Sequence, residues 1–338
     1  MKSVLVLLLV AVCMGTYAQD PHFSQFFSSP LTLNPAYTGK FDGTFRAAGN
    51  YRNQWPTINN AFTTATASVD FAVLQNRIPE FDTWGVGIMG LNDQSGNKIL
   101  NNNFISVSTA YHKALDENGY HTLTVGFQGT YANKRLDLTR ATFEDQLTEF
   151  GFTGITGEVF NSNSNVTIDY FDVNAGLLYS GSTNGFNNFY LGASTYHISR
   201  PEEKFTTTGA KFILNQRLTV HGGGYVPIGR ITTFHGSFIY QQQAGATETV
   251  LGGAIAFSLS NDEYIESNLY AGLWYRFGDA FIPYVGIEFS GIRLGYSYDI
   301  NHSSLSTASN SRGGNEISLI FVRKPADPGR KKLGCPKF

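Results

Sequence analysis

Residues 19–56 read QDPHFSQFFSSPLTLNPAYTGKFDGTFRAAGNYRNQWP and change character halfway along. The first half is aromatic but holds three prolines, at Pro21, Pro30 and Pro35. Proline cannot donate to a β-ladder and interrupts long helices, so this half is not expected to form either. From Thr44 onward apolar and polar residues alternate, which is typical of a β-strand with two different faces. The stretch therefore predicts an irregular lead segment, residues 19–43, followed by a first strand.

The residues before this stretch have the features of a secretory signal peptide. Lys2 is followed by an apolar run that is shorter than the about 20 residues of a transmembrane helix, and small Ala18 precedes a cleavage site. Residues 1–18 are therefore predicted to be removed. Cys335 is then the only cysteine of the mature chain, which excludes an intrachain disulfide and a zinc site built on several cysteines.

The composition narrows the class of protein. Charged residues make up 15% of the chain, compared with about 25% in ordinary soluble domains. The chain has 27 Phe, 18 Tyr and 36 Gly, yet it contains no apolar run long enough for a membrane-spanning helix. An exported chain of this kind is typical of a transmembrane β-barrel. The net charge of −2 gives no sign of nucleic-acid binding.

Alternation with a period of two recurs along the chain and supports a barrel. In 123–131 the apolar set is Leu123, Val125, Phe127, Gly129 and Tyr131, with polar or small residues between its members. About fourteen such runs are present, and an even number lets the sheet close without an edge. Their approximate spans are 44–52, 63–73, 83–95, 100–114, 118–131, 168–181, 187–197, 212–226, 231–242, 246–259, 264–277, 280–289, 291–300 and 315–322.

The runs predict an all-β protein, a closed transmembrane antiparallel barrel over residues 44–322. Several odd-numbered connections are long and most even-numbered ones are short, so both termini are expected in the periplasm. Residues 323–338 form a basic periplasmic tail, which is either simply solvated or able to dock on an acidic surface.

No motif in the sequence indicates catalysis, a cofactor or a metal site. Gly85, Gly87 and Gly90 spell G-x-G-x-x-G, but they lie inside an alternating run rather than at a strand-to-helix turn. Glycines that relieve crowding in a curved wall explain them better. The seven histidines are scattered, without the spacing of a metal motif. We therefore expect a protein that is not an enzyme.

The lead segment is too apolar to be left in water. Its exposed aromatic side chains would be Phe23, Phe26, Phe27 and Tyr37. Burying apolar surface is favourable by about 25 cal/mol per Å², and the barrel interior is the nearest place to do so. We expect the segment to plug or line the periplasmic half of the lumen. A disordered periplasmic leader is the alternative.

The longest connection, Leu136–Thr167, is rich in aromatic and glycine residues. Its aromatic residues include Phe143, Phe150, Phe152 and Phe160. Either the connection folds inward and narrows the pore, or these side chains contact a partner at the cell surface. The two roles are compatible.

Three pieces of the opening stretch resemble one family. The mature start Asp20–Phe26, then Asn34–Gly39, then Tyr51–Pro56 closely resemble the opening of the PorP/SprF family of outer-membrane proteins. The resemblance implies a non-enzymatic barrel in outer-membrane lipid that serves type IX secretion and gliding. Partners would be periplasmic or outer-membrane type IX components (PorP-like role) or a secreted adhesin with a type IX sorting domain (SprF-like role). A general or substrate-selective porin is the alternative.

Overall fold

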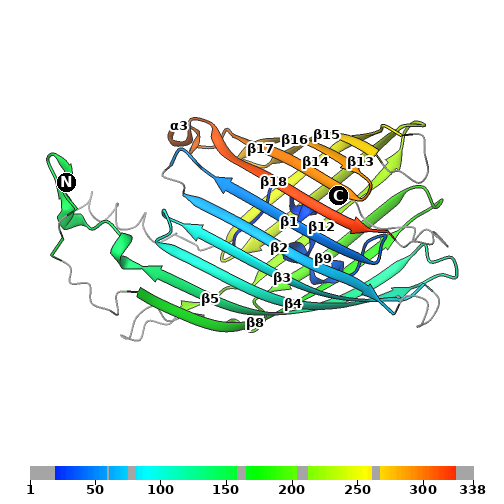
Figure 1. Ribbon diagram of the computed structural model, residues 1–338, viewed down its shortest axis with the longest axis horizontal. Coiled ribbons are helices and arrows are strands. Elements are labelled where there is room, and N and C mark those ends of the chain that lie inside the picture. Colours follow the sequence, from blue (N-terminus) through cyan, green and yellow to red (C-terminus); the bar gives the residue numbers. More distant parts are fainter. Residues whose placement is uncertain are drawn as a thin grey trace.

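The computed structural model describes residues 20–58, 61–74, 81–154, 156–157, 165–203, 212–260 and 267–324. Within them, fourteen antiparallel strands form one closed barrel, which confirms the predicted fold (Figure 1). Each strand pairs with its neighbours in the chain, and the sheet closes where the first strand, β1, pairs with the last, β18. The predicted signal peptide and most of the basic tail, residues 325–338, lie outside the described residues.

The bounds of the barrel strands follow the predicted runs closely. The strands are β1 (Phe45–Gln54), β2 (Phe62–Val73), β3 (Thr83–Ser95), β4 (Leu100–Ala114), β5 (Thr122–Asp137), β8 (Asn165–Gly181), β9 (Asn188–Tyr196), β12 (Arg217–Pro227), β13 (Thr232–Gln243), β14 (Ala246–Ser258), β15 (Ser267–Arg276), β16 (Ala280–Phe289), β17 (Ile292–Asn301) and β18 (Arg312–Arg323).

Two faces of the wall differ as the alternation predicts. On β15, Leu273 is 54% exposed on the outside, whereas the next residue, Trp274, is 1% exposed inside. On β8, Phe171 and Leu177 are exposed and Asp172 between them is buried. The outer face is therefore apolar and the inner face is mostly polar, as a barrel in lipid requires.

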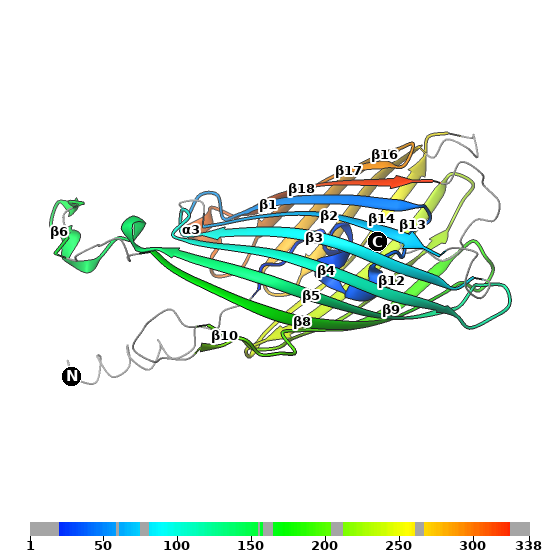
Figure 2. The ribbon, with the colours of Figure 1, turned by 60° about the horizontal axis from the view of Figure 1, so that its bottom comes forward.

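The wall is uneven in height. β5 and β8 have 16 and 17 residues, whereas β15, β16 and β17 have 10 each. Figure 2 shows the long strands extending towards the end that carries the small hairpins and α3 (Ser306–Ser309). We call this end the long-connection end, because the connections from β5 to β8 and from β9 to β12 lie there.

Three predicted strand bounds are wrong by four residues or more, two of them starts and the third the end of β5, which lies at Asp137 rather than at 131. β5 begins at Thr122 rather than at 118, because Asp116 accepts hydrogen bonds from the backbone of Tyr120 and His121 and forms a turn there. β12 begins at Arg217 rather than at 212. The residues before it pair instead in a small hairpin of β10 (Glu202–Glu203) and β11 (Phe212–Ile213).

The described part of the lead segment forms short helical turns inside the barrel, as both views show (Figures 1 and 2). These are the 3-10 helix η2 (Phe26–Ser28), α2 (Pro30–Leu33) and the 3-10 helix η3 (Pro35–Tyr37). Pro30 and Pro35 each begin a turn, where the missing N–H is not needed. The Asn34 side chain caps η3 by accepting from the backbone N–H of Ala36.

Candidate functional site

The aromatic side chains of the lead segment are packed against the inner wall. Phe23 and Phe26 are each 5% exposed and Tyr37 is 6% exposed. Phe27 is partly buried, and its ring centroid lies 4.9 Å from that of Trp274 on β15. All four residues singled out in the sequence thus lie in the lumen. That the segment blocks passage through the barrel stays a prediction.

The segment runs along the lumen rather than occupying one half of it. At its start, the backbone N–H of Asp20 donates to Gln243, at the long-connection end of β13. Near its finish, the backbone N–H of Gly39 donates to Asp70, which lies towards the opposite end of β2. The sequence predicted that the segment lines one half of the lumen, the periplasmic half. In the structure its contacts reach towards both ends of the barrel. The orientation of the barrel in the membrane stays a prediction.

Ser24 is the centre of a buried charged cluster. Its Oγ accepts hydrogen bonds from Arg52 on β1, at 2.5 Å, and from Arg276 on β15, at 2.6 Å. It donates to Asp299 on β17, at 2.8 Å. Asp299 also pairs directly with both arginines, at 3.0 and 2.9 Å. Buried charges are costly unless they are paired and hydrogen-bonded, and here one serine of the lead segment contributes to pairing three of them.

Gln25 and Glu316 form the next layer of contacts. The Glu316 carboxylate on β18 accepts from the backbone N–H of Ser24, at 2.8 Å, and of Gln25, at 3.1 Å. The Gln25 amide donates to the backbone carbonyl of Glu316 and to Ser297 on β17. Its carbonyl oxygen accepts from Ser318 on β18, at 2.6 Å. Gln25 is 1% exposed and all its polar side-chain atoms are used.

Asn34 fixes the middle of the segment to the opposite wall. Its amide nitrogen donates to the carbonyl of Leu177 on β8, at 3.0 Å, and lies 3.0 Å from Nε2 of His221 on β12. The ring of His221 also faces Tyr37, whose hydroxyl lies 3.3 Å from its Nδ1. Asn34 and His221 are both fully buried.

Glycines of the wall make room for the segment. A Cβ on Gly176 would lie 1.8 Å from Oδ1 of Asn34, and one on Gly126 would lie 2.4 Å from the nitrogen of Ala36. A Cβ on Gly85, the first glycine of the G-x-G-x-x-G run, would lie 1.9 Å from the Thr38 carbonyl. This run therefore allows close approach of a second backbone, a stricter requirement than the curvature that we expected.

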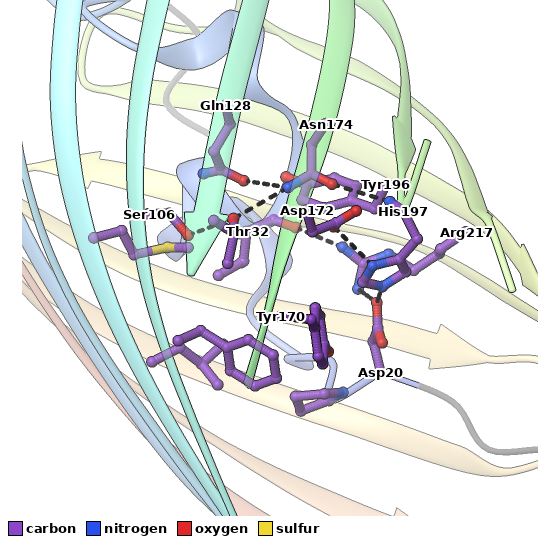
Figure 3. Close-up of a pocket in the computed structure, with 15 residues that line it drawn as sticks. Asp20, Thr32, Ser106, Gln128, Tyr170, Asp172, Asn174, Tyr196, His197 and Arg217 are labelled. Carbon is purple, nitrogen blue, oxygen red and sulfur yellow. Dashed lines mark hydrogen bonds and ion pairs between the residues drawn. The ribbon is translucent and has the colours of Figure 1, made fainter. Parts of the chain in front are cut away.

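A second ionic group holds the first described residue of the segment (Figure 3). The Asp20 carboxylate lies 2.6 Å from Nε2 of His197, just past β9, and 3.4 Å from Arg217 on β12. The other ring nitrogen of His197 lies 2.8 Å from Asp172 on β8. Burial opposes the charged state of His197, but the carboxylates of Asp20 and Asp172 outweigh it and raise its pKa to about 9. Burial likewise opposes ionisation of Asp20, whereas His197 and Arg217 hold its pKa well below the usual range.

A cavity of about 60 Å³ lies between this group and the tall wall. Phe104, Tyr170 and Tyr196 provide aromatic lining, and Asp20 and His197 lie at one side (Figure 3). Among the described residues, no cluster of His, Cys, Asp or Glu could hold a metal ion. Nor does any helix of the described ranges have the length and apolar character to cross a membrane.

The connection between β5 and β8 carries the other predicted site residues. Its described part includes the two-strand hairpin of β6 (Leu147–Thr148) and β7 (Gly151–Phe152), which lies beyond the end of the barrel wall in both views (Figures 1 and 2). Phe150 at its tip is 93% exposed and Phe152 is 60% exposed. Phe143 is partly buried. Phe160 lies outside the described residues.

Sequence reasoning missed the polar anchors of the lead segment. A signal for them was present, because Arg276 and Asp299 fall on the polar face of their strands, where an ionisable residue in a membrane segment needs a partner. The partner residues could not be assigned, since Ser24 is far from both in the chain.

A closed fourteen-stranded barrel with an apolar outer face defines a multi-pass protein of the bacterial outer membrane. Residues 15–321 match the family described as "Type IX secretion system membrane protein PorP/SprF", and the chain belongs to this family. A search of curated proteins found no match. The family is one of secretion-system membrane proteins, which implies contact with secretion components and substrates in general.

Solved barrels resemble the fold at low sequence identity. The TodX monoaromatic hydrocarbon channel deltaS2 mutant is 8% identical with a TM-score of 0.51, and the match covers 87% of this chain and 93% of that one. The TodX deltaS2S3 mutant is 10% identical with a TM-score of 0.50, covering 86% and 92%. The Ralstonia pickettii toluene transporter TbuX is 8% identical with a TM-score of 0.49, covering 87% and 92%. These similarities concern the fold alone.

Proposed function

We propose that this protein is a plugged, non-enzymatic barrel that anchors a secreted adhesin with a type IX sorting domain at the cell surface. The observation that carries the proposal is the hairpin of β6 and β7. Leu147, Phe150 and Phe152 are 58%, 93% and 60% exposed there, away from the lipid-facing wall. Clustered apolar side chains that water surrounds are characteristic of protein interaction sites, and aromatic residues often dominate binding energy.

The position of the lead segment favours an anchor over a porin. Its buried polar contacts reach several sides of the lumen, from Glu316 on β18 to His197 just beyond β9. A porin needs a continuous aqueous channel, and such a channel would have to pass these side chains. We therefore prefer a role in which the outer loops bind a partner and the barrel holds them in the membrane.

The charge of the hairpin suggests the chemistry of the partner. Glu144 and Glu149 are exposed, whereas Asp145 is engaged within the connection by Thr156 and the backbone of Gly157. An acidic, aromatic surface fits a basic patch that surrounds apolar pockets. Such an interface should form more slowly at high salt, because screening weakens attraction between exposed charges.

The test replaces Phe150 and Phe152 by serine and follows the adhesin on the cell surface and in the medium. The matched control is Phe186→Ser, since Phe186 is 74% exposed in the connection from β8 to β9 at the other end of the barrel. We expect the double variant, but not the control, to release adhesin into the medium. Normal display in the double variant would refute the anchoring role. Loss from both surface and medium would indicate a component of translocation, the PorP-like role.

A further inference from the structure

Several contacts of Ser24 and Gln25 lie at one place in the barrel wall, although the Ser24 hydroxyl also reaches Arg276 on β15 and Asp299 on β17. Their backbone N–H groups both donate to Glu316 on β18, and Gln25 bonds Ser297 and Ser318 on β17 and β18. Glu316 is the direct pairing partner of Arg52 on β1. These contacts therefore lie where the last strand meets the first, which we call the seam.

The same carboxylate also connects across the seam. Glu316 accepts from the Asn50 side chain on β1, at 3.1 Å, and lies 3.7 Å from Arg52. Arg52 in turn donates to Ser24. Residues of β1, β18 and the lead segment thus share one buried hydrogen-bond network, in which Glu316, Arg52 and Asn50 are all less than 5% exposed.

The seam differs from other strand pairings in how the chain reaches it. Each of the other pairings joins barrel strands that are consecutive along the chain, whereas β1 and β18 are brought together from opposite ends of the chain. The cost of closing a loop rises with its length, so this pairing receives the least help from local connectivity. Additional hydrogen bonds at the seam therefore stabilise the strand pairing that chain connectivity favours least.

We propose that Ser24 and Gln25 form an internal clamp that keeps the barrel closed at the seam between β1 and β18. Seating of the lead segment and closure of the barrel are then coupled, because Glu316 and Arg52 have both the Ser24 contacts and each other as partners only when both have occurred. A barrel whose lead segment leaves the lumen therefore loses bonds at the seam, in addition to the bonds that the segment makes to β8 and β9. The inference is independent of which partner the outer loops bind.

The chain offers matched variants for a test. Gln25 and Asn34 are both buried carboxamides of the lead segment, but Gln25 bonds the seam and Asn34 bonds β8 and the region of β12. Likewise Ser318 on β18 donates to Gln25 at 2.6 Å, and Ser194 on β9 donates to the Leu33 carbonyl at 2.7 Å. In each pair, one alanine substitution removes hydrogen bonding at the seam, and the other removes hydrogen bonding of a similar kind away from the seam.

The experiment measures amide hydrogen exchange in detergent-folded full-length protein, with β1 and β18 compared with β8 and β9. Gln25→Ala removes the three side-chain hydrogen bonds of Gln25, so we expect it to speed exchange at β1 and β18 by about tenfold or more. Asn34→Ala should leave the seam unchanged. If Gln25→Ala does not fold, Ser318→Ala and Ser194→Ala give the same comparison with a single bond removed. Faster exchange that is equal at the seam and at β8 and β9, or unchanged exchange at the seam, would overturn the clamp.

Discussion

Replacing Ser24 by alanine removes one hydroxyl from the centre of the charged cluster. The hydroxyl accepts from Arg52 and Arg276 and donates to Asp299, so three charged groups each lose a partner. A hydrogen bond to a charged group contributes about 1.5–3 kcal/mol. Because Asp299 still pairs directly with both arginines, we expect the loss to be partly recovered, to a net of roughly 2–3 kcal/mol.

A second serine of the same segment is the matched control. Ser28 is as buried as Ser24, yet its Oγ has no hydrogen-bond partner among the described residues. Replacing an unsatisfied buried hydroxyl by a methyl group removes no bond, so Ser28→Ala should be close to neutral or slightly stabilising.

The assay is thermal unfolding in detergent, followed by the change in gel mobility between folded and unfolded barrel. At about 2–4 °C per kcal/mol, Ser24→Ala should lower the transition by roughly 4–12 °C, and Ser28→Ala by almost nothing. Equal decreases in the unfolding temperature of the two variants would show that burial of the serine, rather than its bonds to the charged cluster, determines the loss of stability.

Three further predictions concern the outer face, the glycines and pH. Leu273→Arg should cost about 2–4 kcal/mol in membrane insertion, and equal assembly of Leu273→Ala and Leu273→Arg would show that this face does not meet lipid. Gly126→Ala should make the lead segment more sensitive to protease, because its Cβ would lie 2.4 Å from Ala36. Gly129→Ala on the same strand has open space around it among the described residues and should not, so equal cleavage of the two variants would show that the lead segment does not pack on Gly126. The raised pKa of His197 means that its ion pairs with carboxylates stabilise the fold fully below about pH 6.5, and that this stabilisation is lost as the pH rises through about 9. The unfolding temperature should fall over this pH range more in wild type than in His197→Gln. Parallel curves of unfolding temperature against pH would show that His197 is not the group responsible.

The strands could be predicted because their signal is local. Alternation in 123–131 or 269–277 needs no knowledge of the rest of the chain, and an even number of such runs allows the closure that the structure shows. The start of β12 was predicted wrongly because Phe212 and Ile213 are as apolar as a barrel strand, and only their pairing with Glu202 and Glu203 separates them from it.

The anchors of the lead segment could not be predicted because they are not local. The contact between Gln25 and Ser318 joins residues 293 positions apart, and nothing near either residue indicates the other. The glycines of the wall illustrate the same limit. The run from Gly85 to Gly90 suggested a crowded wall, but only the structure identifies the lead segment as the cause at Gly85, and the same close approach at Gly126 and Gly176.

The Trp274 side chain shows that the inner face beneath the lead segment is filled. Trp274 is 1% exposed, packs on Phe27 and donates to Ser237 at 3.0 Å. An arginine at this position would lose that packing and place a charge in a filled space, so inner-face residues beneath the lead segment behave as core residues.

The most direct test of the central claim, that the lead segment keeps the lumen closed, is the ionic conductance of the purified full-length protein in a planar lipid bilayer. We predict that wild-type barrels insert without steady open-channel currents, and that Gly126→Ala, which displaces the segment, conducts. Steady porin-like currents from the wild-type protein, with the lead segment intact by mass spectrometry, would show that the lumen is open and support the porin instead.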